Sequence, residues 1–284
     1  MQKILITGGK GMLGRTLQKQ FADYELIIAD LPEADICDAY ALLDFFRHNA
    51  PDIVIHCAAM TQVDNCESDL EGAFRLNAAG SANVAAAAKA VGARLIAVST
   101  DYVFRGDAAQ PYTENDATEP QTVYGMSKLA GENAIREIYD NHVIARIAWL
   151  YGSGGPSFLH TMLKLADGSR PVLKVVNDQH GNPTSTNAVA KGLRNIIMHP
   201  ELKGVFHLTC EGEATWYEFT REIFRQRNIN QKVIPCATAE YPRPAPRPAN
   251  SRLAKQRLRE AGLPAMPDWR TALAEFLSDE FGTK

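Results

Sequence analysis

Short apolar runs alternate with longer helical patterns along the first half of the chain. The apolar runs are rich in Val and Ile, which is typical of strands in a parallel sheet that is buried on both faces. Strands are predicted at residues 3–7, 25–30, 52–57, 94–100 and 142–148. Helices are predicted between them at residues 12–21, 39–48, 70–91 and 123–139. This alternation predicts an α/β fold with a doubly wound parallel sheet.

The pattern loosens in the second half, where a glycine-rich loop is followed by recurring proline-rich turns. We therefore expect a first domain at residues 1–150 and, at residues 151–284, mainly a smaller α/β lobe that binds the substrate. A helix at residues 187–198 and a buried strand at residues 204–209 are expected to return to the first domain. That domain is thus predicted to be joined by segments near residues 185–209.

The composition is that of an ordinary globular chain and argues against several classes of function. The 284 residues are 45% hydrophobic and 22% charged, which is enough for one large core or for two domains that share a cleft. The formal net charge of −3 shows no basic excess, so we expect no nucleic-acid partner. The apolar run near the N-terminus is too short for a signal sequence or a spanning helix, so we expect no membrane association.

The cysteines and histidines do not indicate a metal site. The five cysteines are scattered and never form a C-x-x-C pair, which favours free thiols and predicts a cytoplasmic location. His56, His142 and His207 fall in apolar runs without metal-ligand spacing, so we expect satisfied core residues and no metal.

Three glycines follow the first predicted strand in the spacing G-x-x-G-x-x-G. Gly8 and Gly11 let the backbone turn tightly and approach a pyrophosphate, and Gly14 allows close packing between helix and strand. The helix that begins here offers unsatisfied N–H groups and the positive end of its dipole to an anion. The pattern therefore predicts a Rossmann-type dinucleotide site.

Asp30 ends the second predicted strand, about where a ribose-binding acid is expected after such a loop. A carboxylate there accepts hydrogen bonds from ribose hydroxyls and repels a 2′-phosphate, which favours NADH over NADPH. The position also suits an ordinary solvent-exposed aspartate, and both cofactors stay open.

Tyr124 and Lys128 are four residues apart at the start of a predicted helix, which places them on one face, one turn apart. A phenol with a pKa near 10 is a poor acid–base group at neutral pH unless a cation favours its phenolate. Thr100 ends the fourth predicted strand, and ligands of a doubly wound sheet lie at the carboxyl ends of its strands. We therefore expect Thr100 to contact a substrate oxygen beside Tyr124.

These motifs together resemble the extended short-chain dehydrogenase/reductase family nearly end to end. The resemblance is carried by the glycine loop, His56-Cys57-Ala58-Ala59, the run from Ser99 to Phe104, and Tyr124-Gly-x-x-Lys128. Within that family the chain is most similar to the dTDP-4-dehydrorhamnose reductases. The motifs for this subgroup are Thr61-x-Val63-Asp64, Asn177-Asp178-Gln179-x-Gly181-x-Pro183-Thr184 and Arg247-Pro248-x-Asn250-Ser251-Arg252-Leu253.

The resemblance implies the reduction of a dTDP-4-keto-sugar substrate by NADH or NADPH. It implies a catalytic triad of Thr100, Tyr124 and Lys128, with Tyr124 donating the proton. It implies that the cofactor is bound by Gly8, Gly11, Met12, Leu13, Gly14, Asp30, Asp35, Ile36, Ala58, Ala59, Thr61, Tyr124 and Lys128. It implies substrate contacts from Val63, Thr100, Asp101, Tyr102 and Trp149. A buried core tryptophan is the alternative for Trp149.

The substrate diphosphate must be met by local basic groups on a chain of slightly negative net charge. Arg247 is the preferred candidate, because the prolines beside it hold its loop rigid and guanidinium groups suit phosphate oxygens. A solvated loop arginine is the alternative. For Arg252, in the same run, the alternative is an exposed helix position.

Two positions depart from the patterns of the resembled proteins. Ser157 stands where the reductases usually carry an asparagine, which puts one substrate contact in doubt. Arg15 stands where relatives with metal-bridged dimers have an acidic residue. The sequence leaves a monomer or a homodimer open.

Other functions on the same fold stay open as alternatives. A nucleotide-sugar dehydratase pattern places Asp-Glu after the active threonine, whereas here Asp101 is followed by Tyr102. The other two alternatives are an epimerase and a non-catalytic regulatory subunit of the same fold. The intact Thr100, Tyr124 and Lys128 favour an enzyme.

Overall fold

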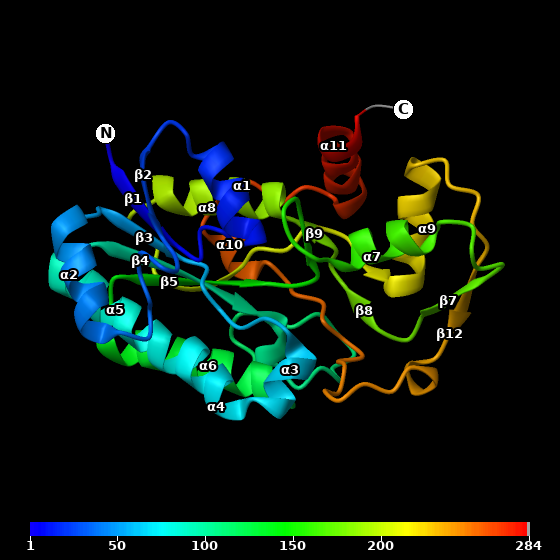
Figure 1. Ribbon diagram of the computed structural model, residues 1–284, viewed down its shortest axis with the longest axis horizontal. Helices are drawn as coiled ribbons and strands as arrows, with labels where there is room; N and C mark the ends of the chain where they lie inside the picture. The colour runs from blue at the N-terminus through cyan, green and yellow to red at the C-terminus, as the bar shows by residue number, and fades with distance from the viewer. Residues whose placement is uncertain (283–284) are drawn as a thin grey trace.

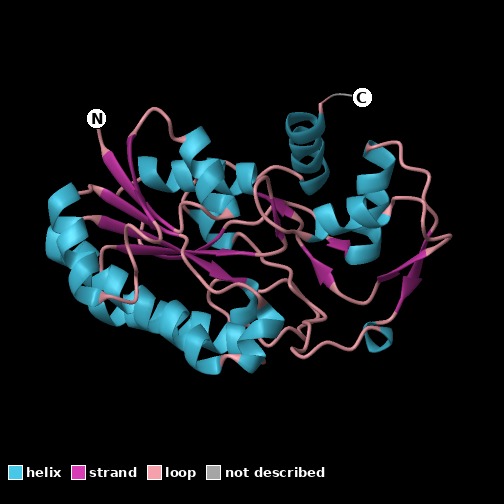
Figure 2. Ribbon diagram, in the orientation of Figure 1, coloured by secondary structure: helices cyan, strands magenta, loops and turns pink. Residues whose placement is uncertain are grey.

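The computed structural model describes residues 1–282, and its centre is a parallel sheet of six strands (Figures 1 and 2). The strands are β1 (Lys3–Thr7), β2 (Glu25–Ala29), β3 (Ile53–His56), β4 (Arg94–Thr100), β5 (His142–Ile147) and β10 (Gly204–His207). Their order across the sheet is β10-β5-β4-β3-β1-β2, and every neighbouring pair is parallel. The predicted doubly wound α/β fold is confirmed.

Helices cover both faces of this sheet (Figure 1). One face carries α2 (Ala39–Asn49), α5 (Gly80–Val91) and α6 (Val123–Ile138), and the other carries α1 (Met12–Gln20) and α8 (Thr186–Met198). Alternate residues of a strand therefore enter different cores. In β1, Ile4 and Ile6 pack with Leu17 of α1, whereas Leu5 packs on the opposite side with Phe46 of α2.

Full burial explains why the strands read as continuous apolar runs rather than as alternating ones. Ile4, Leu5 and Ile6 each have no exposed surface. Burying a side chain of this size is worth about 1.5–3 kcal/mol, so both faces contribute to holding β1 at the centre of the sheet.

The segment expected to form one helix at residues 70–91 is three joined pieces. These are α4 (Leu70–Phe74), a π-helical segment η1 (Arg75–Ala79) and α5. In η1, the buried amide of Asn77 accepts from the Met60 N–H at 2.8 Å and donates to the Met60 carbonyl and to the Ser127 hydroxyl. These hydrogen bonds connect the loop after β3 to α6. A pattern of hydrophobic positions does not predict such side-chain contacts.

A smaller lobe lies beside the carboxyl edge of the sheet, on the right in Figure 1. Its elements are β6 (Leu150–Tyr151), α7 (Phe158–Leu165), β7 (Leu173–Val176), β8 (His180–Gly181), β9 (Thr184–Ser185), β11 (Ala214–Thr215), α9 (Trp216–Gln226), β12 (Val233–Cys236) and η3 (Thr238–Glu240). The remaining elements are η2 (Asp101–Val103), α3 (Val63–Ser68), α10 (Gln256–Glu260) and α11 (Trp269–Phe281).

Two later segments lie with the first half of the chain. The predicted helix at residues 187–198 is α8, which packs against α1. The predicted strand at residues 204–209 is the shorter β10, which pairs with β5. The division into two domains at residue 150 stays a prediction. Within residues 1–282, no helix is long and apolar enough to cross a membrane.

A buried carboxylate joins α6 to two central strands. Glu132 of α6 accepts from the Ser99 hydroxyl at 2.6 Å and from Arg146 Nε and Nη2 at 2.9 and 2.7 Å. Glu132 and Arg146 are each only 2% exposed. Burial alone would raise the pKa of Glu132, but the hydrogen bonds and the charge of Arg146 hold it below its ordinary value. The contact fixes the helix against β4 and β5.

We predict that Glu132→Gln destabilises the protein by about 3–5 kcal/mol, because the Arg146 guanidinium is left buried without its counter-charge. Urea unfolding measures this. The folded-state pKa of Glu132 is lowered, so its contribution is present above the unfolded pKa and is lost as pH falls through the folded one. The wild type should therefore lose more stability on acidification than the variant.

The matched control is Glu275→Gln, which breaks the exposed pair with Lys191. That variant should lose at most about 1 kcal/mol. Equal losses in the two variants would contradict the structural importance of Glu132.

Candidate active site

At two positions of the glycine loop between β1 and α1, other backbone atoms lie so close that there is no room for a side chain. Gly8 has φ +67°, and a Cβ there would lie 2.6 Å from the backbone nitrogen of Ala58. A Cβ on Gly14 would lie 2.5 Å from the carbonyl oxygen of Gly8. Gly11 is less constrained, because its Cβ would only reach 3.2 Å from that same oxygen. The loop therefore brings its backbone against the end of β3.

This loop lies where the chain changes direction across the sheet. From β1 the chain first goes to β2 on one side, and β3 then pairs with β1 on the other side. Such a switch point leaves a crevice at the carboxyl ends of the strands, and α1 begins there with its free N–H groups.

Two cavities open on the two sides of the glycine loop. Every residue predicted to bind the cofactor lines one or both of them. The cavity toward β2 measures about 320 Å³, and the one toward β4 measures about 390 Å³. The first is lined by Gly8, Gly11, Asp30, Asp35, Ile36, Ala58 and Ala59, among others. The second is lined by Gly8, Gly11, Met12, Leu13, Gly14, Ala59, Thr61, Tyr124 and Lys128, among others.

Asp30 lies at the end of β2 and already holds the loop. Its carboxylate accepts from the backbone N–H of Lys10 at 2.7 Å and of Leu31 at 2.8 Å. The Lys10 ammonium pairs with Glu33 at 3.1 Å. A carboxylate held in this way keeps lone pairs for further donors.

The three predicted catalytic residues line the second cavity together. Helix α6 begins directly before Tyr124, because the Thr122 hydroxyl caps it by accepting from the Gly125 N–H at 3.0 Å. Tyr124 and Lys128 are both buried on the face toward β4, which ends at Thr100. The rings of Tyr102 and Tyr124 meet edge to face with centroids 5.4 Å apart.

Burial dominates the acid–base properties of this cavity. It raises the pKa of Tyr124 well above its ordinary value, while hydrogen bonding to Thr100 acts in the opposite direction. It lowers the pKa of Lys128 to about 8, with Glu132 acting in the opposite direction. The Lys128 ammonium donates to the Val98 carbonyl at 2.9 Å, and its expected influence on the pKa of Tyr124 stays a prediction. Tyr124 is thus a protonated phenol at neutral pH.

Asp101 is the other buried ionisable group here. Its Oδ1 accepts from the Thr100 hydroxyl at 3.1 Å, and its Oδ2 has no partner among the residues described. Burial raises the pKa of Asp101 to about 6, although the hydrogen bond from Thr100 acts against this. The residue lines the cavity as a potential hydrogen-bond acceptor.

A third cavity of about 620 Å³ continues from the second into the smaller lobe. Tyr102 and Trp149 line both. Trp149 stacks on Trp216 with ring centroids 3.4 Å apart and planes 4° from parallel. It therefore forms a wall between the two spaces and is only partly buried. Its role toward the substrate stays a prediction.

Basic side chains gather in the third cavity. Its lining includes the predicted Arg247 and three further residues, Arg170, Lys174 and Arg243. These three residues belong to no motif and lie at exposed positions, so the sequence alone does not identify them as site residues. Arg247 Nη2 donates to Asp64 Oδ2 at 2.8 Å, and its Nη1 donates to the Ala245 carbonyl at 2.9 Å.

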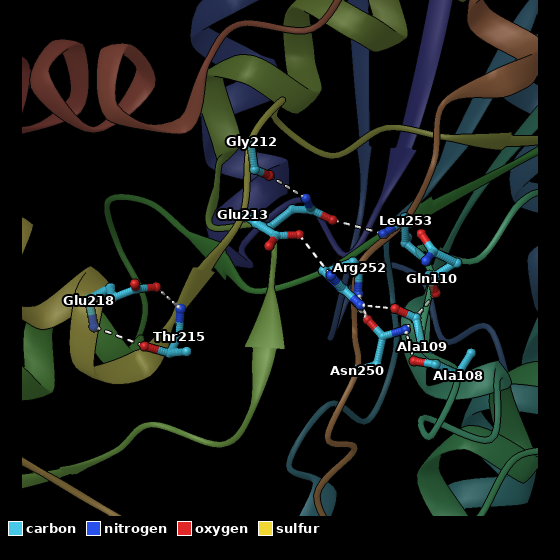
Figure 3. Close-up of polar contacts among 11 residues, drawn as sticks. Ala108, Ala109, Gln110, Gly212, Glu213, Thr215, Glu218, Asn250, Arg252 and Leu253 are labelled. Carbon is cyan, nitrogen blue, oxygen red and sulfur yellow. Dashed lines mark hydrogen bonds and ion pairs between the residues drawn. The ribbon is translucent and has the colours of Figure 1, made fainter.

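Arg252 lies outside any helix, so the alternative of an exposed helix position is wrong. Its guanidinium donates to Glu213 at 2.9 Å and to the Ala109 carbonyl at 2.7 Å (Figure 3). These contacts fasten the late motif to its neighbours, and Arg252 does not line the third cavity.

The two residues that depart from the patterns of similar proteins, Ser157 and Arg15, each form hydrogen bonds with nearby residues. Ser157 caps α7, and its hydroxyl bonds His160 Nδ1 at 2.8 Å. Arg15 donates from Nε to the Lys10 carbonyl at 2.7 Å, which braces the glycine loop. Among residues 1–282, no group of three or more His, Cys, Asp or Glu side chains is arranged to hold a metal.

The buried histidines are held by polar neighbours. His56 lies between the hydroxyls of Thr7 at 2.7 Å and Ser81 at 3.0 Å, and burial lowers its pKa to about 3. His142 bonds the Tyr139 carbonyl, and His207 bonds the Ala254 carbonyl at 2.7 Å. In the described part of the chain, only His207 leaves a buried ring nitrogen, Nε2, without a partner.

Comparison with known proteins shows the family to which the chain belongs. A family model described as RmlD substrate binding domain matches residues 1–281. The chain is 37% identical to a dTDP-4-dehydrorhamnose reductase of Escherichia coli (strain K12), over 99% of this chain and 98% of that protein.

Solved structures agree with the sequence match. A dTDP-4-dehydrorhamnose reductase from Clostridium acetobutylicum is 44% identical with a TM-score of 0.94, over 98% of this chain and 99% of that one. Another from Bacillus anthracis, in complex with NADP, is 36% identical with a TM-score of 0.95, over 98% and 100% of the two chains.

We predict that Gly8→Ala weakens NADPH binding by at least about tenfold, because the new methyl group would push the loop from Ala58. Losing one hydrogen bond to a charged phosphate costs about 1.5–3 kcal/mol, which corresponds to that factor or more. Fluorescence titration measures the Kd.

Gly92→Ala is the matched control, because Gly92 has φ +73° but open space around it. Gly92→Ala introduces the same kind of backbone strain as Gly8→Ala, but it should leave the affinity for NADPH unchanged. Unaltered affinity in Gly8→Ala would remove this loop from the cofactor site.

Proposed function

Because the chain belongs to the family described as RmlD substrate binding domain, we propose that it is an oxidoreductase that reduces the C4 keto group of dTDP-4-dehydro-6-deoxy-L-mannose to give dTDP-L-rhamnose. The cofactor is NADH or NADPH. The full-length match to a named reductase and the likeness to one in complex with NADP support both statements.

The observation that carries this proposal is the order of the three cavities. The glycine loop borders the first two, Thr100, Tyr124 and Lys128 line the second, and Arg247 lines the third. Tyr102 and Trp149 lie at the boundary of the second and third cavities and line both. The cofactor would occupy the first two cavities with its nicotinamide in the second beside the reacting sugar, and the substrate diphosphate would lie in the third.

Each residue of the triad has a chemical task that its surroundings support. The bound nicotinamide supplies the hydride. Thr100 and Tyr124 orient the keto oxygen, and Tyr124 gives its proton to the alkoxide that forms, which is far more basic than a phenolate. The raised pKa of Tyr124 keeps that proton available at neutral pH. Lys128 binds the ribose and adds positive charge beside the phenol.

The structure favours reduction over the related dehydration. A dehydratase needs a base to remove the C5 proton, and the position after Asp101 holds Tyr102. Burial raises the pKa of Tyr102 well above its ordinary value, so this phenol stays protonated and is not a base. A monomer or homodimer and a cytoplasmic location remain predictions.

The direct test is a single-turnover reaction of the keto sugar with NADPH, followed by NMR of the product. We expect one L-rhamnosyl product per cofactor oxidised. No oxidation of NADPH or NADH with the keto sugar would favour a non-catalytic subunit. Stoichiometric cofactor retained after purification would favour an epimerase.

We predict that Tyr124→Phe lowers kcat by at least the roughly 10²-fold that is typical of lost general acid catalysis. The Kd for NADPH should stay nearly unchanged, because the ring still packs against Tyr102 and only the hydroxyl is removed. Steady-state kinetics and fluorescence titration measure the two. Tyr217→Phe, outside all three cavities, is the control. A variant with most of the wild-type kcat would refute the role of Tyr124.

We predict that Lys128→Met raises KM for NADPH and alters the pH profile. The pKa of Lys128 is about 8, so its positive charge is present below that pH and is lost as the pH rises. The wild type should therefore lose kcat/KM on the alkaline side with an apparent pKa near 8, and the variant should lack this limb.

The matched control is Lys89→Met. Lys89 also donates to a backbone carbonyl, that of Ile138 at 2.9 Å, but it is exposed and lies outside the cavities. Unchanged cofactor affinity together with an unchanged pH profile in Lys128→Met would leave Lys128 with no catalytic role.

A further inference from the structure

A proline-rich segment crosses from the smaller lobe to the sheet and borders the third cavity. This proline strap, residues 241–248, has proline at every second position, and Tyr241, Arg243 and Arg247 from it line the cavity. It is the orange stretch after β12 along the lower right of Figure 1. Proline has no N–H, so the strap offers backbone donors only at alternate residues and is poorly suited to a sheet ladder. Its position depends on side-chain contacts.

Both ends of the strap are fastened. Before it, Asp178 accepts from the Thr238 N–H at 2.9 Å and from the Thr238 hydroxyl at 2.6 Å. After it, the Asn250 amide donates to the carbonyls of Ala108 and Gln110, both at 2.8 Å (Figure 3). The strap is thus held at one end by the smaller lobe and at the other by the loop that follows β4.

The middle of the strap is held by one carboxylate. Asp64 Oδ1 accepts from the Ala245 N–H at 3.2 Å, and Asp64 Oδ2 accepts from Arg247 Nη2 at 2.8 Å. The Ala245 carbonyl in turn accepts from Arg247 Nη1. These contacts close a ring that fixes the guanidinium relative to the strap backbone, and Ala245 is completely buried beneath it.

Asp64 belongs to the opposite side of the cleft. It lies in the first turn of α3, next to Val63, which lines the cavity of Thr100 and Tyr124. One helical turn therefore borders the reacting centre and also holds the arginine of the third cavity. The pair is only partly exposed, with 22% of the Arg247 side chain and 27% of the Asp64 side chain accessible.

The contact leaves Arg247 able to bind an anion. A guanidinium has five N–H donors, and the ring of contacts uses two, so three remain. Arg170, Lys174 and Arg243 line the same cavity and Asp64 is its only carboxylate among the residues described, so the lining has a net positive charge. Burial pushes the pKa of Asp64 upward, but the hydrogen bond and charge of Arg247 keep it below its ordinary value, so Asp64 is ionised at neutral pH.

We propose that Asp64 is a positioning residue: it holds the proline strap so that Arg247 faces the diphosphate of the substrate at a fixed distance from Tyr124. This proposal rests on the proposed function for the identity of the substrate. Without the carboxylate, the guanidinium regains its rotamers and the diphosphate must order it on binding, which lowers affinity.

Calorimetry with dTDP tests the proposal in a double-mutant cycle. Arg247→Ala should raise the Kd for dTDP about tenfold, and Asp64→Ala should raise it by about fivefold, as expected when one charge-assisted hydrogen bond is removed or disordered. Because Asp64 acts through Arg247, the double variant should bind dTDP no more weakly than Arg247→Ala alone. Asp64→Asn, which keeps an acceptor for Ala245, should lie between the wild type and Asp64→Ala.

Kinetics separate positioning from a general structural effect. Asp64→Ala should raise KM for the dTDP-sugar while kcat at saturating substrate stays within about twofold and the Kd for NADPH is unchanged. Glu213→Gln is the matched control, because it breaks a similar pair, with Arg252 at 2.9 Å, in the same late motif but outside the cavities. That variant should bind dTDP as the wild type does.

Three results would overturn the proposal. Additive losses in the double variant would show that Asp64 does not act through Arg247. Tighter dTDP binding by Asp64→Ala would show that the carboxylate competes with the diphosphate. A wild type that binds dTDP but does not reduce the keto sugar would refute the proposed function and leave the cycle valid, whereas a wild type without dTDP affinity would refute both.

Discussion

The buried contact between Glu132 and Arg146 is the interaction on which the candidate site depends. Glu132 lies one turn beyond Lys128 on α6, and another of its partners, Ser99, precedes Thr100 on β4. The same carboxylate therefore fixes the helix that carries the phenol and ammonium against the strand that carries the hydroxyl. Breaking one partner of a buried pair is costly, so the distance between these groups is set by the core rather than by the cavity.

The sheet then brings the other parts of the site to the same edge. All six strands run parallel, so the residues at or just after the carboxyl ends of β1, β3, β4 and β5 share one edge of the sheet. Gly8, Ala58, Thr100 and Trp149 occupy these four positions. The close approach of Gly8 to Ala58 shows that the first two are in backbone contact.

Much of this could be predicted from the sequence, because the signals are local. The strand limits follow from apolar runs, the loop from glycine spacing, and the shared face of Tyr124 and Lys128 from helical periodicity. What the pattern does not indicate depends on contacts between distant segments. Asp64 and Arg247 are separated by 183 positions, and Asn77 reaches Ser127 across 50. The burial that raises the pKa of Tyr124 also follows only from the packed structure.

The wall between the second and third cavities is made by both parts of the chain. Trp149, just after β5, has φ +49°, a conformation that costs a non-glycine residue about 1–3 kcal/mol and persists only where its surroundings impose it. The surroundings come from the smaller lobe: Trp216 stacks on its ring, and a Cβ on Gly181 would lie 2.3 Å from Trp149 Cε2. The sheet therefore supplies the tryptophan, and the smaller lobe holds it in this conformation. The boundary between the two cavities is complete only when both are folded against each other, which explains why a candidate site with its proposed catalytic residues on one half still needs the other.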